Sequence, residues 1–145
     1  MSSSTTPRWL RDRSVDEDLI EEAPELRFFA PKGVADVEEV ADMMVRGGLR
    51  ILAGPRPRAD TRPPRSYWQK VRGEFHLLLC TNHPKYRRLR RNLASAAGKS
   101  NAVLIGIIAA ALADRLGLTA GAITGFVAVC LAGAIELGTK AFCAD

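Results

Sequence analysis

Residues 101–142 read NAVLIGIIAAALADRLGLTAGAITGFVAVCLAGAIELGTKAF, and this stretch decides the fold. Only four of its side chains carry charge, and these are Asp114, Arg115, Glu136 and Lys140. A helix that is apolar on all sides is either deeply buried in a core or in contact with a bilayer. The stretch therefore has to be covered by the rest of the chain, by a partner or by lipid.

A short polar break divides this stretch into two predicted helices, 101–116 and 119–142. Gly117 suits the positive-φ position that follows a helix, and Ser100 or Asn101 can cap the first helix. Thr119 suits the N-cap of the second helix. Because so short a turn places successive helices antiparallel, the sequence predicts an apolar helical hairpin over residues 101–142.

The length of the hairpin helices leaves their environment open. A membrane-spanning helix needs about 20 apolar residues, and the uncharged run 118–135 only approaches that length. Small residues in this run recur at the spacing that lets two helices approach closely, in membranes especially. The predicted helix-contact residues are Gly121, Gly125, Ala128 and Ala132.

Two amphipathic helices are predicted before the hairpin, at residues 66–80 and 84–97. Each places large apolar side chains along one stripe, including Trp68 and Phe75 in the first and Leu89 and Leu93 in the second. These stripes can pack against the hairpin. The predicted fold class is therefore mainly α, with a C-terminal four-helix unit in a helical domain over residues 66–145.

The N-terminal part has a mixed character. Residues 1–24 form a predicted disordered, acidic segment with a short helix near 15–22, capped by Ser14. Residues 25–53 are predicted to form a small strand–helix–strand or irregular segment, with strands at 25–30 and 49–53 and a helix at 34–46. Four prolines within residues 54–65 favour an extended Pro/Arg linker.

Charge is strongly segregated along the chain. Residues 43–99 carry 14 basic and 2 acidic side chains, whereas residues 1–42 carry 5 basic and 11 acidic ones. A basic block indicates an anionic partner such as lipid, nucleic acid or an acidic protein, although it is also consistent with a solvated helix face. The cations predicted to make the anionic contact are Lys85, Arg87, Arg88, Arg90 and Arg91.

The motifs that usually carry chemistry are incomplete. The run AAGKSN at 96–101 resembles the end of a phosphate loop, but Leu93 occupies the position of its first glycine. His76, Cys80 and His83 have a metal-ligand spacing that Pro84 interrupts. Three widely spaced cysteines predict free thiols in a reducing compartment. We therefore expect no enzymatic activity, no cofactor and no metal.

Three functions remain open at this point. The leading hypothesis is a small non-enzymatic helical protein that associates with a membrane or oligomerises through its apolar hairpin, as a membrane effector or assembly adaptor. The alternatives are a soluble helical subunit that binds a protein partner and a small basic nucleic-acid-binding module. The N-terminus lacks a secretory signal, which predicts a location in the cytoplasm or on the cytoplasmic side of a membrane.

Overall fold

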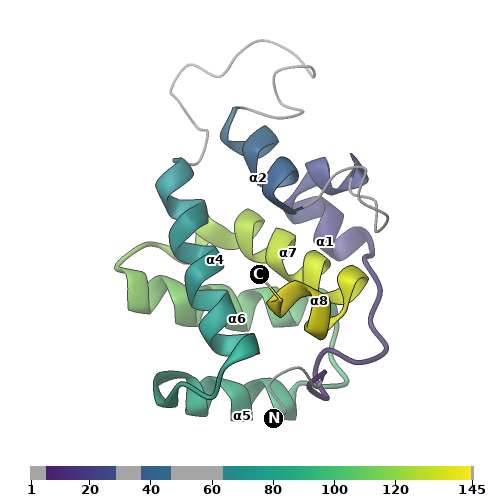
Figure 1. Cartoon of the computed structure of the whole chain (residues 1–145), viewed down its shortest axis with the longest axis vertical. Coiled ribbons are helices and arrows are strands. Elements are labelled where there is room, and N and C mark those ends of the chain that lie inside the picture. Colours follow the sequence, from purple (N-terminus) through teal and green to yellow (C-terminus); the bar gives the residue numbers. More distant parts are fainter. Residues whose placement is uncertain (1–5, 29–36, 47–63, 145) are drawn as a thin grey trace.

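The structure is a computed structural model that describes residues 6–28, 37–46 and 64–144. These residues are mainly helical and contain no strand, which confirms the mainly α part of the predicted fold class (Figure 1). The helices, with the labels of Figure 1 and η for 3₁₀ helices, are α1 (Glu17–Glu22), η1 (Pro24–Phe28), α2 (Val37–Val45), α4 (Arg65–Cys80), η2 (Pro84–Tyr86), α5 (Arg87–Ser95), α6 (Asn101–Leu116), α7 (Ala120–Leu137) and α8 (Thr139–Cys143).

Helix α7 is the centre of the fold. It packs against α1, α2, α4, α6 and α8, and every residue from 126 to 134 is buried. Its sequence explains this position, because a helix with no polar side must be covered on all sides. The apolar stretch is thus covered largely by other parts of the same chain.

The ends of α6 follow the sequence signals. The Ser100 side chain accepts a hydrogen bond from the Val103 backbone N–H, and Gly117 adopts a φ of +72° immediately after the helix. The second predicted helix differs from the structure, because it is interrupted at Gly138. This glycine has a φ of +85°, a backbone conformation that side chains rarely tolerate, and the chain turns there into the separate helix α8.

The N-terminal segment is more ordered than the sequence predicts. Trp9 and Leu10 are 4% and 3% exposed, and both belong to the hydrophobic core. The N-cap of α1 is Asp16 and not Ser14, since the Asp16 carboxylate accepts a hydrogen bond from the Leu19 backbone N–H. Burial of a few apolar side chains therefore holds a segment whose composition indicates disorder.

The predicted first strand, at residues 25–30, is also wrong where the structure describes it. Pro24–Phe28 form a 3₁₀ helix that packs against α1 and α2. The helix predicted at 34–46 is present as α2 over Val37–Val45, and residues 34–36 lie outside the described residues. The second predicted strand, at 49–53, lies outside the described residues, as does the predicted linker up to residue 63.

A disulfide between Cys80 and Cys143 corrects the prediction of three free thiols. The two cysteines are 63 residues apart, but α8 returns to the end of α4 and brings their Cα atoms to 5.6 Å. In the chain-entropy treatment, closing a loop of that length stabilises the fold by about 4 kcal/mol. Cys130 alone is free, and its complete burial in α7 raises the pKa of its thiol.

The small residues of α7 make contacts within the chain. A Cβ atom added at Gly125 would lie 3.1 Å from the Glu22 carbonyl oxygen, so α1 approaches α7 closely there. Ala128 and Ala132 are fully buried. Gly121 differs, because it is exposed and a Cβ added there would meet nothing within 4 Å.

Gly133 and Gly121 provide a matched test of this packing. A Cβ at position 133 would lie 2.5 Å from Val37 Cγ1 and 3.2 Å from the Phe142 ring. We expect Gly133→Ala to lower the free energy of unfolding by about 1–3 kcal/mol. Gly121→Ala should leave it unchanged or raise it by up to about 1 kcal/mol, because alanine favours a helix. Chemical denaturation measures both, and equal effects at the two positions would contradict the packing.

Candidate functional site

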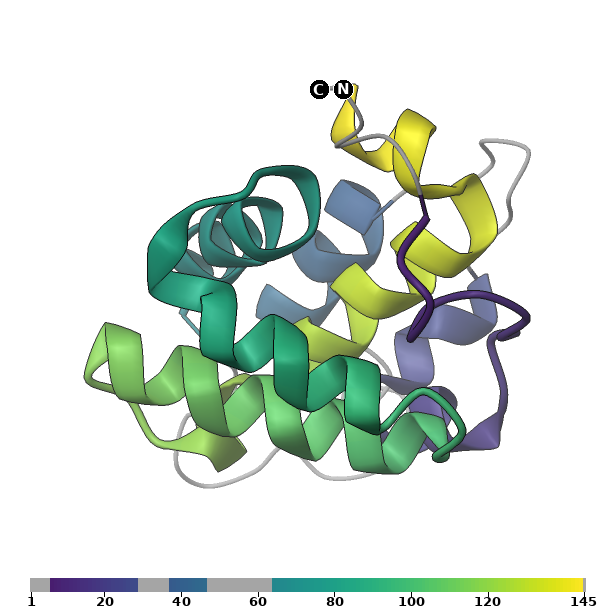
Figure 2. The same ribbon diagram turned by 90° about the horizontal axis from the view of Figure 1, so that it is seen from below.

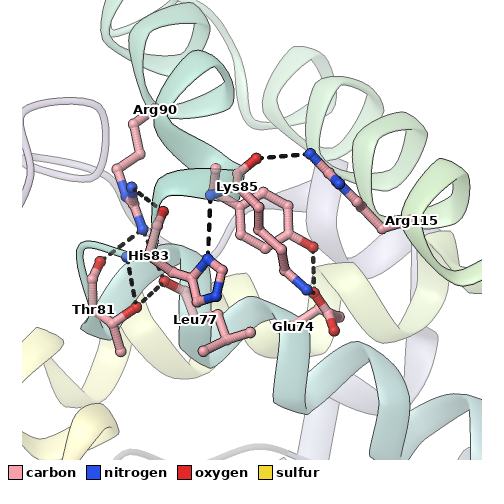
Figure 3. A network of polar contacts seen from close by, with 8 residues as sticks. Glu74, Leu77, Thr81, His83, Lys85, Arg90 and Arg115 are labelled. Carbon is pink, nitrogen blue, oxygen red and sulfur yellow. Dashed lines mark hydrogen bonds and ion pairs between the residues drawn. The ribbon is translucent and has the colours of Figure 1, made fainter.

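The five cations predicted to contact an anionic surface fall into two groups, those bonded within the chain and those exposed to solvent. Arg90 turns inward and binds the backbone carbonyl oxygens at the end of α4. Its guanidinium donates to Leu77 and Leu78 at 3.0 Å each and to Thr81 at 2.7 Å, and it also donates to His83 at 2.9 Å. Figure 3 shows the Arg90 side chain directed at Thr81 and His83 beyond the end of α4. Arg90 therefore caps α4 and has few donors left for a ligand.

Burial, and after it the charge of Arg87, lowers the pKa of Arg90. A guanidinium has so high a pKa that Arg90 nevertheless stays charged at neutral pH. Its charge therefore faces the negative end of the α4 macrodipole, where a cation is stabilising.

Lys85 is also engaged within the chain. Its Nζ lies 2.9 Å from a carboxylate oxygen of Glu74, and its carbonyl oxygen accepts a hydrogen bond from Arg115 at 3.0 Å (Figure 3). The Tyr86 hydroxyl donates to the same Glu74 carboxylate. These contacts join η2 to both α4 and α6.

The pKa values in this cluster follow from the same contacts. Burial raises the pKa of Tyr86, and its hydrogen bond to Glu74 raises it further, so the phenol stays protonated. Burial also acts to raise the pKa of Glu74, but the hydrogen bonds from Tyr86 and Lys85 and the charges of Lys85 and Arg115 outweigh it and lower the pKa overall. Glu74 is thus an ionised structural acceptor.

The other three cations remain available. Arg87, Arg88 and Arg91 are exposed on α5, and none of them has a hydrogen bond or ion pair from its side chain within the described ranges. Their spacing of three and four residues places them on one side of the helix. Lys99, which is exposed just beyond the end of α5, adds a fourth cation.

The neighbouring helix α6 has an uncharged outer side. Leu104, Ile108 and Leu112 are buried on its inner side. Val103 is 42% exposed on the opposite side, and Ile107 is partly exposed. The small residues Ala102, Gly106 and Ala110 complete this outer side, which carries no charge before Asp114.

These two helices lie next to each other. Figure 2 shows α5 and α6 side by side and antiparallel, in front of the rest of the molecule, and the two helices are in contact. Each of the two helices buries one side and exposes the other. We call this surface the α5–α6 face: Arg87, Arg88, Arg91 and Lys99 beside Ala102, Val103, Gly106, Ile107 and Ala110.

Arg13 positions the α5–α6 turn, and sequence reasoning missed it. Its guanidinium donates to the Ala97 carbonyl oxygen and to Asn101 Oδ1, both at 3.0 Å. Asn101 in turn donates to the Ser14 carbonyl oxygen at 3.0 Å. The prediction of disorder for residues 1–24 concealed this role, because no sequence pattern links Arg13 to a helix end more than 80 residues away.

Other features of the described residues offer little for catalysis. A cavity of about 440 Å³ lies between residues 6–13 and the end of α7. Its lining includes Arg11, Asp12 and Arg13 but no histidine or cysteine. Within the part of the chain that the structure describes, no three His, Cys, Asp or Glu side chains gather as a metal site.

One described helix, α7, is long and apolar enough to cross a membrane by length and composition alone. More than half of that segment, 56%, is buried inside the protein. Its composition is therefore also that of a core helix, and its membrane-like sequence does not by itself distinguish the two environments.

The two arginines at positions 90 and 91 provide a test of the division between capping and free cations. We expect Arg90→Met to lower the free energy of unfolding by about 2–4 kcal/mol, because it leaves several helix-end carbonyl groups without a charged donor. Arg91→Met should change it by less than about 0.5 kcal/mol. Thermal or chemical unfolding of the two variants measures this, and similar losses would show that Arg90 is not a structural cap.

No family model, no curated protein and no solved structure matches this chain. What the chain does therefore has to be inferred from its residues and their geometry, and the α5–α6 face is the surface on which that inference rests.

Proposed function

We propose that the protein is a non-enzymatic, peripheral membrane-binding protein that rests on anionic lipid through the α5–α6 face. The single observation that supports this most is that two helices in contact expose unpaired arginines, on α5, and an uncharged outer side, on α6. Basic side chains next to an apolar strip are the usual composition of a helical surface that lies in the membrane interface. The proposal retains lipid as the partner but leaves α7 in the core.

The expected strength of this contact is modest. Each basic side chain near an anionic leaflet contributes about 1 kcal/mol, so four cations contribute about 4 kcal/mol. Partial burial of Val103 and Ile107 adds roughly 1 kcal/mol. A total of about 5 kcal/mol corresponds to a dissociation constant of about 0.2 mM, which describes reversible binding to a lipid surface.

Peripheral binding also fits the packing better than insertion of the hairpin. Insertion would have to separate α7 from α1, α2, α4 and α8, and it would expose the apolar sides of those helices to water. A domain of this size has a net stability of only about 5–15 kcal/mol, so losing the central helix would unfold it. The α5–α6 face needs no such rearrangement.

The other partners fit this face less well. Two copies that meet face to face with antiparallel α6 helices would bring two arginine rows together, and like charges at an interface are costly. Nucleic acid binding favours aromatic side chains on which bases can stack, and Tyr86, the aromatic residue beside these arginines, is 1% exposed. An acidic protein partner would bind the same basic side chains as anionic lipid does. The vesicle experiment described next distinguishes lipid binding from this alternative.

Vesicle sedimentation tests the proposal. We expect the folded protein to sediment with vesicles of phosphatidylcholine and phosphatidylserine but not with phosphatidylcholine alone. Arg87→Glu/Arg91→Glu should abolish binding. The matched control is Lys70→Glu/Lys140→Glu, which changes the net charge equally at exposed positions of α4 and α8 and should retain binding.

Two results would overturn the proposal. If the Arg87/Arg91 variant still binds, the arginines form only a solvated helix side. If both double variants lose binding equally, net charge alone attracts the protein and the α5–α6 face has no special role. Sedimentation-equilibrium measurements without lipid identify self-association, and the salt dependence of oligonucleotide binding identifies the nucleic-acid alternative.

A further inference from the structure

The C-terminal helix α8 forms a strap across the end of the fold. It contains five residues, Thr139–Cys143, and follows the positive-φ turn at Gly138. A helix of this length is not stable alone in water. Its position therefore depends on the groups that hold it to α4 and α7, and one of these is the bond from Cys143 to Cys80.

Phe142 is the second group that holds α8 in place. Its side chain packs against α4 and α7, and we call the surface that it covers the Phe142 seat. The Phe142 ring is 4% exposed and packs edge-on against Phe75 of α4, with ring centroids 5.6 Å apart. Gly133 of α7 makes room for this ring, because a Cβ there would lie 3.2 Å from it. Removing the strap would therefore uncover apolar surface on both α4 and α7.

We infer that the Cys80–Cys143 bond is a site of thiol–disulfide exchange, at which a dithiol reductant releases α8 and uncovers the Phe142 seat while the remaining helices stay folded. This goes beyond membrane binding and does not depend on it. Figure 2 places α8 at the upper edge of the molecule and α6 at the lower edge, so the strap lies away from the α5–α6 face.

The exposure of the two sulfur-bearing residues determines where a reductant attacks. Cys80 ends α4 and is 7% exposed, whereas Cys143 ends the short helix α8 and is only partly buried. A dithiol thiolate attacks the Cys143 sulfur, which forms a mixed disulfide and releases the Cys80 thiolate to take up a proton. The second thiol of the reductant then displaces Cys143, so the protein gains two thiols and the dithiol becomes a cyclic disulfide.

The remaining cysteine cannot complete this reaction. Cys130 is fully buried in α7, and a buried thiol that is kept protonated is a poor nucleophile. The resolving thiol must therefore come from the reductant, which is why we assign a dithiol as the reaction partner.

The structure also indicates that opening is local. The helices other than α8 also contact one another directly, including α6 with α7 and α4 with α7, and these contacts do not involve α8. Helix α8 contains only five residues, and Gly138 already provides the turn about which it can move. Segments of this kind open at low free energy in proteins that otherwise remain folded.

Residue-resolved amide exchange of the full-length oxidised protein, before and after reduction by dithiothreitol, tests the inference. The Phe142 and Ala144 amides are hydrogen-bonded in and after α8, and we expect both to exchange at least about tenfold faster after reduction. Amides of Val127 and Leu131 in α7 should keep their exchange rates. Cys143→Ser should show the open pattern without reductant, and Cys130→Ala should respond as the unmodified protein does.

A second measurement does not depend on whether these variants fold. The oxidised protein is treated with reduced glutathione, quenched with acid and mapped by mass spectrometry, and the adduct is expected on Cys143. The inference is overturned if reduction leaves Phe142 and Ala144 unchanged, or if the α7 amides accelerate equally and show that the disulfide secures the whole fold. An adduct found mainly on Cys80 would overturn the direction of attack.

Discussion

Nine consecutive residues of α7, from 126 to 134, have to be kept out of water on every side, and the rest of the fold follows from this constraint. One neighbouring helix can cover only part of such a surface, so five helices surround it. The N-terminal segment takes part because α1 and α2 cover a side of α7 that the C-terminal helices leave open. Gly125 and Gly133 allow this close approach, since a side chain at either position would collide with a neighbour.

Hydrogen bonds from arginine side chains to the ends of helices also hold the fold together. Arg90 binds the carbonyl groups at the end of α4, and Arg13 binds those at the end of α5. Both arginines use backbone acceptors, which are present in any helix and leave no mark in the sequence. This is why neighbouring residues such as Arg90 and Arg91 look equivalent in sequence and have different surroundings in the fold.

The positions and ends of several helices could be predicted from local sequence signals, whereas contacts between residues far apart in the sequence could not. Apolar spacing located α2, α4 and α5, and the signals at residues 100–101 and at Gly117 located the two ends of α6. Nothing local shows that Cys143 meets Cys80 or that Trp9 enters the core, because both depend on where distant helices pack. In the candidate site, the basic character of α5 could be predicted from the sequence. Which of its cations caps α4 and which stay free depends on where the α4 carbonyl groups lie, and the sequence does not show this.

The disulfide also bears on the environment of the protein. Disulfides persist in oxidising compartments and are uncommon in the cytosol. If the strap opens by thiol–disulfide exchange, its state reports the redox poise of the compartment in which the protein lies.

The central claim is that lipid contacts the α5–α6 face while α7 stays in the core. Hydrogen-exchange mass spectrometry of the protein with and without phosphatidylserine-containing vesicles tests it directly. We predict slower exchange in peptides from residues 87–112 and unchanged exchange in peptides from residues 123–134. Vesicle-induced exchange changes centred on α7, with residues 87–112 unaffected, would contradict the account and indicate that the hairpin leaves the core to enter the bilayer.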